Sequence, residues 1–283
     1  MTRKKISIGY INEKKERGEK SPRMTLYNYP MAVLAEEAGI EIINVGDSIA
    51  MVAFGYDSTL PANLDVMVEH AKAVRRGAPT AFIMGDMPFL SYGVSMEETI
   101  KNAGRYLTEA DMDAVKLEGG EEVAPIIHKL TEVGIPVIAH TGLTPQDIKV
   151  LGSYKTQGRD APSAKKLLAK VKALEEAGAI AIVIESIPAE AAKIIYERTN
   201  IPVLGTGIGP YSDSPMINAY DLLGFFERTP RFAKRYANLR AEIGRAFAEF
   251  VDEVITKKYP AEEHCYHMLE GEYEKLLEML QEG

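Results

Sequence analysis

The chain has 283 residues, of which 46% are hydrophobic and 26% charged, the balance of an ordinary water-soluble globular protein. Its 33 Lys and Arg against 41 Asp and Glu give a net charge of −8, which excludes a general attraction for nucleic acid or anionic membranes. The single cysteine, Cys265, excludes an intramolecular disulfide and a cysteine-rich metal site. The N-terminus lacks the apolar core of a signal peptide and no apolar run approaches the roughly 20 residues of a membrane span, so we predict a cytoplasmic protein.

Short apolar runs alternate along the chain with stretches of helical length. Strands are expected at 24–27, 42–46, 80–85, 114–118, 136–140, 180–185 and 201–205, with a weaker eighth near 216–218. Helices are expected at 30–38, 63–75, 95–110, 121–132, 163–177 and 189–199. Repeated strand–helix units predict a parallel sheet with right-handed crossovers, and eight of them favour a closed (β/α)8 TIM barrel over an open sheet.

Both ends of the chain extend this barrel. Residues 1–22 are a charged extension in which 13–17 are expected to form a solvated helix. Residues 230–283 are expected to form extra C-terminal helices, at about 232–257 and 266–281. Because there is no composition break or flexible linker, we assign residues 1–283 to a single barrel domain.

Five of the expected strands end in a residue that can do chemistry. These residues are Asp47, Asp86, Glu118, His140 and Glu185. In a barrel the C-terminal strand ends face one mouth, so we expect the five side chains to converge on one pocket. Carboxylates on neighbouring strands suit Mg²⁺, which prefers oxygen ligands. For either aspartate alone, helix capping is the ordinary alternative. Together the five predict a metal-assisted reaction on a small anionic substrate.

Lys116 lies two residues before Glu118, so both side chains point the same way from their strand. An inward direction near the mouth is favoured, since a charged pair facing the helical layer would be costly without partners. Lys116 would there neutralise a substrate carboxylate. A lone histidine is more often structural, but the strand-end position favours function for His140, and Glu185 is a candidate general base.

A glycine-rich segment at 205–209 resembles a phosphate-binding loop. A dinucleotide-binding fingerprint follows the first strand and opens a helix, whereas this segment comes late and runs into Pro210. We therefore interpret it as a loop at the barrel mouth, where the backbone approaches a ligand or a neighbour closely.

Motifs around these residues extend over about 24–268, nearly the whole chain. They lie at 45–48, 55–61, 72–77, 86–89, 114–120, 140–146, 158–159, 185–190 and 259–264. In this order they are highly specific together, and the chain resembles the ketopantoate hydroxymethyltransferase family. That family belongs to the phosphoenolpyruvate/pyruvate group of barrels.

The resemblance implies a reaction and its partners. The family transfers a hydroxymethyl group from 5,10-methylenetetrahydrofolate to 2-oxoisovalerate (3-methyl-2-oxobutanoate), which gives ketopantoate for pantothenate biosynthesis. The implied cofactor is Mg²⁺, with the folate as co-substrate and a small 2-oxo acid as substrate. The resemblance also implies a homo-oligomer, typically a decamer.

The resemblance also assigns roles to residues of this chain. Asp47 and Asp86 are implied to ligate Mg²⁺, and through it to bind the substrate, with Glu118 bound to the metal directly or through water. Glu185 corresponds to the base that takes the C3 proton. The residues implied to hold the substrate carboxylate and carbonyl are Ser48, Lys116 and His140.

The chain departs from the family pattern before its eighth strand. Asp213-Ser214-Pro215 stands where the family has Asp-Gly-Gln, and we expect this segment at the barrel mouth. Pro215 removes a backbone donor and a side-chain amide there. Two alternatives stay open. One is a related metal–enolate lyase, hydrolase or mutase acting on a different 2-oxo acid, and the other is a non-catalytic paralogue that serves as an assembly or binding subunit.

Overall fold

The computed structural model describes residues 3–281, and its centre is a closed barrel of eight parallel strands. The strands are β1 (Arg23–Thr25), β2 (Ile42–Val45), β3 (Phe82–Asp86), β4 (Ala114–Glu118), β5 (Val137–Gly142), β6 (Ala181–Glu185), β7 (Val203–Thr206) and β8 (Ser214–Asn218). Each strand pairs with its neighbours in sequence, and β1 pairs with β8 to close the barrel. The predicted (β/α)8 fold is confirmed, and the weak eighth strand is present with two more residues at its start.

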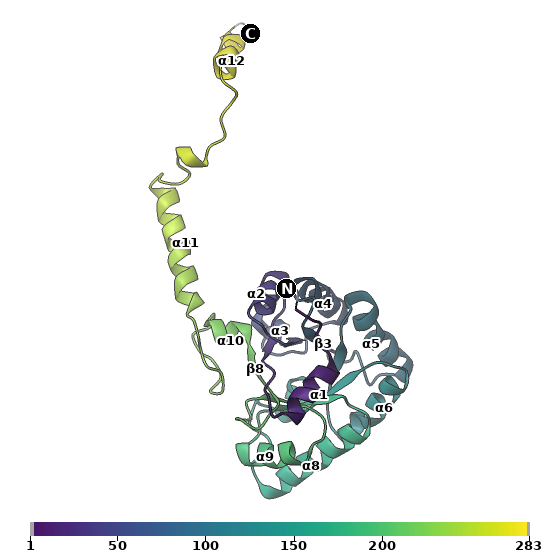
Figure 1. Ribbon diagram of the computed structural model, residues 1–283. Helices are drawn as coiled ribbons and strands as arrows, with labels where there is room; N and C mark the ends of the chain where they lie inside the picture. The colour runs from purple at the N-terminus through teal and green to yellow at the C-terminus, as the bar shows by residue number, and fades with distance from the viewer. Residues whose placement is uncertain (1–2, 282–283) are drawn as a thin grey trace.

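Helices cover the outside of the barrel (Figure 1). They are α2 (Tyr29–Glu37), α3 (Ile49–Val52), α4 (Leu64–Gly77), α5 (Met96–Ala110), α6 (Ala124–Glu132), α7 (Ile148–Leu151), α8 (Ala161–Glu176), α9 (Ala189–Arg198) and α10 (Ala219–Leu223), with short 3₁₀ turns η1 (Glu121–Val123) and η2 (Pro145–Asp147). A third 3₁₀ turn, η3 (Glu262–His264), lies in the C-terminal segment beyond the barrel. The Asn63 and Ser95 side chains begin α4 and α5 by accepting hydrogen bonds from the backbone N–H groups of Val66 and Glu98. Local capping therefore fixes where these two helices start.

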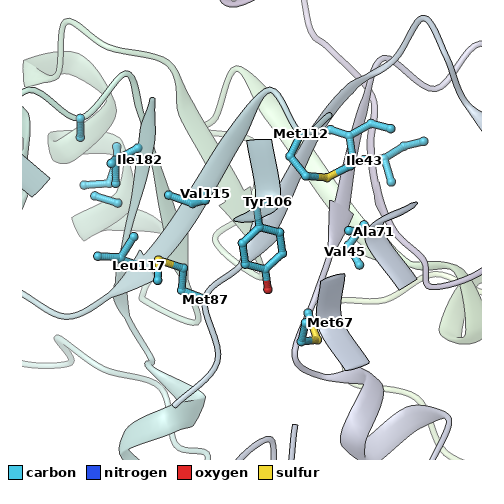
Figure 2. Close-up of a cluster of buried hydrophobic side chains, with 14 of the residues drawn as sticks. Ile43, Val45, Met67, Ala71, Met87, Tyr106, Met112, Val115, Leu117 and Ile182 are labelled. Carbon is cyan, nitrogen blue, oxygen red and sulfur yellow. The ribbon is translucent and has the colours of Figure 1, made fainter. Parts of the chain in front are cut away.

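The main apolar core lies between the strands and the helices. Ile43, Val115 and Leu117 point outward from their strands into it, and Figure 2 shows part of it with Tyr106 of α5 in the middle of the view. A Cβ at Gly85 would lie 2.5 Å from the Tyr106 ring, so only glycine allows α5 to pack this closely. The Tyr106 hydroxyl donates to the backbone carbonyl of Asp86, and this packing therefore fixes the end of β3.

A second, smaller core fills the N-terminal end of the barrel. Its strand residues are Ile42, Phe82, Met84, Ala114, Ile138, Ala181, Val183 and Leu204. Ile6 and Ile11, from the segment that contains α1 (Ile8–Glu16), pack onto this layer. The helix predicted at 13–17 is the last part of α1, which begins earlier because Ser7 caps it and ends at Glu16. It is not fully solvated as predicted, because Lys14 is buried and pairs with Glu41. This end of the barrel is closed by α1.

The expected position of the segment 213–215 is wrong. Lys15 of α1 lies 3.0 Å from the Asp213 carboxylate, and Pro215 pairs with Gly205 in the first half of β8. A strand rises by about 3.3 Å per residue, so these residues lie well below the mouth, which β8 reaches only at Asn218. The Ser-Pro departure therefore lies at the closed end of the barrel.

The helices α11 (Leu239–Ile255) and α12 (Glu272–Gln281) extend away from the barrel (Figure 1). Their predicted starts at 232 and 266 are wrong. Residues 230–238 turn back onto the barrel, where the backbone N–H of Tyr236 donates to the carbonyl of Leu222, and Gly271 with φ +79° precedes α12. Among residues 3–281, no helix has both the length and the apolar character needed to cross a membrane.

Candidate active site

A cavity of about 400 Å³ opens at the C-terminal ends of the strands. Every site residue predicted from the sequence lines it, namely Asp47, Ser48, Asp86, Lys116, Glu118, His140 and Glu185. Lys116 and Glu118 both point inward, as their spacing predicted, because alternate residues of a strand share a face. The barrel thus brings residues of five strands and their following loops together at one mouth.

Three buried carboxylates form a cluster on one wall of this cavity. Asp86 and Glu118 end β3 and β4, and Asp47 follows β2 by two residues. Each offers an oxygen within 4.8 Å of the others, and their exposed fractions are only 3–5%. Burying like charges this closely is costly unless cations offset them. Three convergent carboxylate oxygens are a donor set that fits Mg²⁺.

Lys116 is the one lysine or arginine that touches this cluster among residues 3–281. Its Nζ lies 2.9 Å from Asp86 Oδ2 and 3.1 Å from Glu118 Oε1. Burial acts to lower the pKa of Lys116, but the carboxylates outweigh it and raise this pKa. Burial acts to raise the pKa of Glu118, yet Lys116 and His140 lower it to about 2. Burial, Glu118 and Asp86 raise the pKa of Asp47 well above its usual range, so the neighbouring positive charges do not satisfy all three acids.

Two amide side chains that the sequence analysis did not single out orient these acids. Asn44 Nδ2 donates to Asp86 Oδ1 at 3.1 Å. Gln146 Nε2 donates to Asp47 Oδ2 at 2.7 Å, and its backbone N–H donates to Glu118 Oε2 at 3.1 Å. Asn44 was visible as a polar residue inside a buried apolar run, whereas only the chain reversal after β5 brings Gln146 over the acids.

His140 connects the acidic cluster to Glu185. Its Nδ1 lies 3.1 Å from Glu118 Oε1, and its Nε2 lies 3.4 Å from Glu185 Oε2. Burial and Lys116 act to lower the pKa of His140, but the two glutamates outweigh them and the pKa is raised. The Glu185 side chain keeps 19% of its surface exposed, so it can reach a ligand in the cavity. Gly142 has φ +97° and a Cβ there would lie 2.4 Å from the Glu185 carbonyl, so glycine is required beside this residue.

Ser48 belongs to a chain of hydrogen bonds across the mouth. Its Oγ lies 2.8 Å from Tyr27 Oη, which accepts a 2.6 Å hydrogen bond from Asn218 Nδ2. Tyr27 is buried, and burial raises its pKa, so the phenol stays protonated. These hydrogen bonds link the ends of β8 and β2, and Ser48 and Asn218 line the cavity.

The glycine-rich loop lies at the mouth, as its sequence predicted. It follows β7, and Gly207 has φ +65° with the Phe232 ring only 2.8 Å from where its Cβ would be. Phe232 and Pro230 line the cavity. The segment between α10 and α11 therefore forms part of the wall over the strand ends.

Comparisons with known proteins agree with this arrangement. The family model described as ketopantoate hydroxymethyltransferase matches residues 5–262. Proteins named 3-methyl-2-oxobutanoate hydroxymethyltransferase from Bacillus thuringiensis (strain Al Hakam) and Bacillus anthracis are 49% identical over 259 residues, which cover 91% of this chain and 93% of theirs.

Solved structures with lower identity share the fold. A phosphonopyruvate hydrolase in complex with oxalate and Mg²⁺ has a TM-score of 0.60 and 15% identity, covering 97% of each chain. A 2,3-dimethylmalate lyase, a member of the PEP mutase/isocitrate lyase superfamily, has a TM-score of 0.55 and 15% identity, covering 98% of each chain. These two enzymes therefore share the barrel fold of this chain. With 49% identity to curated enzymes over nine-tenths of its length, the chain belongs to the ketopantoate hydroxymethyltransferase family.

Proposed function

We propose that this enzyme transfers a hydroxymethyl group from 5,10-methylenetetrahydrofolate to C3 of a 2-oxo acid through an enolate. The family acceptor, 3-methyl-2-oxobutanoate, is the first candidate, and its product would be ketopantoate for pantothenate biosynthesis. One observation carries the proposal: a buried three-carboxylate cluster and the Glu185 carboxylate face one cavity, with His140 between them. The names of relatives that are 49% identical support it.

The acidic cluster would hold the metal. Asp47, Asp86 and Glu118 offer hard oxygen donors, and the raised pKa of Asp47 indicates that the cluster lacks positive charge. When bound, Mg²⁺ supplies a Lewis acid that polarises the 2-oxo group and stabilises enolate charge. Gln146 and Asn44 hold the ligand carboxylates in position.

The remaining residues would bind the acid and move its proton. Ser48, Lys116 and His140 hold the substrate carboxylate and carbonyl, and the raised pKa of Lys116 keeps its charge available for the developing oxyanion. Glu185 takes the C3 proton. C3 then bonds to the methylene carbon of the folate, and both bonds of that carbon to the folate nitrogens break. Water supplies the hydroxyl group, and its second proton and the proton taken from C3 end on the two nitrogens.

We also propose a homo-oligomer, a decamer by family likeness. The helices α11 and α12 extend from the barrel (Figure 1). Both helices carry exposed apolar side chains. These include Phe247, Phe250, Val251, Val254, Ile255, Leu276, Leu277 and Leu280. Contiguous exposed apolar surface usually marks a protein interface, and a second copy of the chain is the partner proposed here. Light scattering coupled to gel filtration tests this, and a monomeric mass would contradict it.

The reaction is tested by proton NMR in D₂O. Purified protein is given Mg²⁺ and 3-methyl-2-oxobutanoate, with 2-oxobutyrate and pyruvate in parallel, before and after the folate donor is added. We expect metal-dependent exchange of the C3 proton, followed by a hydroxymethylated product. Exchange without transfer would favour a related metal–enolate enzyme, and no exchange with any acid would overturn the proposal.

A further inference from the structure

A guanidinium buried in the same cavity has no part in the proposed reaction. Arg23, the first residue of β1, is only 3% exposed and lines the cavity together with Glu185 and the acidic cluster. Its Nη2 donates to Thr206 Oγ1 at 3.0 Å and to the Gly205 carbonyl at 3.2 Å. Both acceptors belong to β7 and neither is charged.

Arg23 differs from the other buried cations of the protein. Residues 3–281 contain four buried lysine and arginine side chains. Lys14 pairs with Glu41, Arg75 with Asp113, and Lys116 with two acids of the cluster. Within that part of the chain, Arg23 alone forms no ion pair with a carboxylate.

The Arg23 guanidinium therefore keeps unused donors, although the charges of Glu185 and Asp86 act on it from farther away. Both of its hydrogen bonds come from Nη2, and Nε is buried with no partner among residues 3–281. Burial lowers the pKa of Arg23 to about 10, so the group still stays cationic at neutral pH. Burying a charge is costly unless an oppositely charged group accompanies it. The free Nη1 donors and the open cavity indicate that a ligand anion supplies this partner.

The position of Arg23 shows which part of a substrate it would meet. Thr206, its hydrogen-bond acceptor, pairs in register with Glu185 between β7 and β6. In the proposed reaction Glu185 takes the C3 proton, so the substituent on C3 lies near this wall. The carboxylate and carbonyl of the acid lie instead at the cluster on β2–β4. Arg23 therefore faces the part of the substrate beyond C3.

We infer that Arg23 binds a second carboxylate, carried on the C3 substituent of the acceptor, and that the preferred substrate class is dicarboxylic 2-oxo acids. This inference rests on the proposed function, which it narrows from 2-oxo acids in general. The cavity of about 400 Å³ has room for a longer acid than a branched five-carbon one. A charge-assisted hydrogen bond from a buried guanidinium favours a carboxylate strongly over an alkyl group of the same shape.

The test compares acids that differ only in this second charge. C3 exchange in D₂O with Mg²⁺ is measured for 2-oxoglutarate, 2-oxoadipate and 3-methyl-2-oxobutanoate. A further acid, 5-methyl-2-oxohexanoate, has an isopropyl group in place of the terminal carboxylate of 2-oxoglutarate. We expect the C3 proton of a dicarboxylic acid to exchange about 10- to 100-fold faster than that of the analogue, which lacks the second carboxylate. Calorimetry with 2-oxoglutarate and Mg²⁺ gives the same comparison for binding alone.

Variants then assign the preference to Arg23. In Arg23→Met the dicarboxylic acid and its analogue are expected to exchange at equal rates. Arg23→Lys is expected to retain part of the preference for the dicarboxylic acid. Arg76→Met is the matched control, because it removes an exposed cation of α4 outside the cavity and should leave the ratio unchanged. If Arg23→Met does not fold, Thr206→Val removes one neutral anchor of the guanidinium and should still weaken dicarboxylate binding.

The outcomes separate the two proposals. Exchange of 3-methyl-2-oxobutanoate in preference to both dicarboxylic acids overturns the role of Arg23 and leaves the transferase standing. If no acid exchanges its C3 proton, the proposed transferase function is overturned. Binding measurements then decide whether Arg23 forms a carboxylate subsite. Arg23-dependent binding of 2-oxoglutarate then supports it, whereas absent binding, or binding equal in Arg23→Met, overturns it.

Discussion

His140 Nε2 lies 3.4 Å from the carboxylate of Glu185, and the opposite nitrogen of the ring lies 3.1 Å from Glu118. One imidazole thus lies between the acidic cluster and the fourth carboxylate of the cavity. The glutamates raise the pKa of His140 even though burial opposes them. In the proposed reaction, this ring would couple proton uptake by Glu185 to the charge in the cluster.

Glu185→Gln should remove the proton acceptor and leave the metal cluster intact. The substitution keeps the size of the side chain but loses its basicity, so C3 exchange should fall by about 10²- to 10⁴-fold. Mn²⁺ affinity, measured by electron paramagnetic resonance, should stay within about twofold, because Glu185 lies outside the acidic triad. Wild-type exchange in the variant would remove Glu185 from the role of base.

Gln146→Met should weaken metal binding without touching a ligand. The variant loses the 2.7 Å hydrogen bond to Asp47 Oδ2 and a second bond to the Met87 carbonyl, which together position that carboxylate. Loss of such outer partners typically costs about 10- to 100-fold in metal affinity. Gln157→Met is the control, because that amide donates only to the Lys155 carbonyl among residues 3–281. Equal Mg²⁺ affinities in the two variants, measured by calorimetry, would contradict the positioning role.

Metal affinity should rise with pH through Asp47. Burial and two neighbouring acids raise the pKa of this carboxyl, so it keeps its proton at a higher pH than an ordinary aspartic acid. A cation that needs the ionised form must displace this proton, and binding therefore strengthens as pH increases. Calorimetry in buffers of different ionisation enthalpy should detect proton release. Asp47→Asn should abolish the release, and a pH-independent affinity in the wild type would refute this linkage.

Lys116→Met should destabilise the metal-free protein strongly. It removes the cation that lies within 3.1 Å of both Asp86 and Glu118 and leaves their charges buried, a loss of about 3–5 kcal/mol. Saturating Mg²⁺ should recover part of the stability, because it restores positive charge and binds the folded state. Lys101→Met, which breaks an exposed pair with Glu97, should cost less than about 1 kcal/mol. Thermal unfolding with and without Mg²⁺ measures both, and an unfolding temperature unaffected by Mg²⁺ in Lys116→Met would oppose this account.

Local signals explain most of what the sequence predicted. Runs of β-branched residues predict the buried strands. The caps at Asn63 and Ser95 predict the starts of their helices to within one turn. The barrel topology then places the site residues together, because the C-terminal residues of all its parallel strands lie at one mouth. The convergence of the predicted site residues followed from fold class alone.

The errors arose where distant contacts decide the structure. Residues 230–238 have helical composition, but Tyr236 bonds to Leu222 and Phe232 packs on Gly207, so the helix starts only at Leu239. Arg23 begins a strand of only three residues, and nothing in its neighbours reveals whether it points to solvent or to the centre of the barrel. Its orientation follows from pairing with both β2 and β8.

The closure of the N-terminal end of the barrel by α1 and Ile6 affects the order in which the substrates can bind. Because the N-terminal end of the barrel is filled, substrates and products enter and leave the cavity through the mouth at the C-terminal ends of the strands. In the proposed reaction the small 2-oxo acid and the much larger folate donor both enter through this mouth. The acid must then arrive before the donor and cannot escape until the donor leaves. Product-inhibition patterns should reveal such a compulsory order.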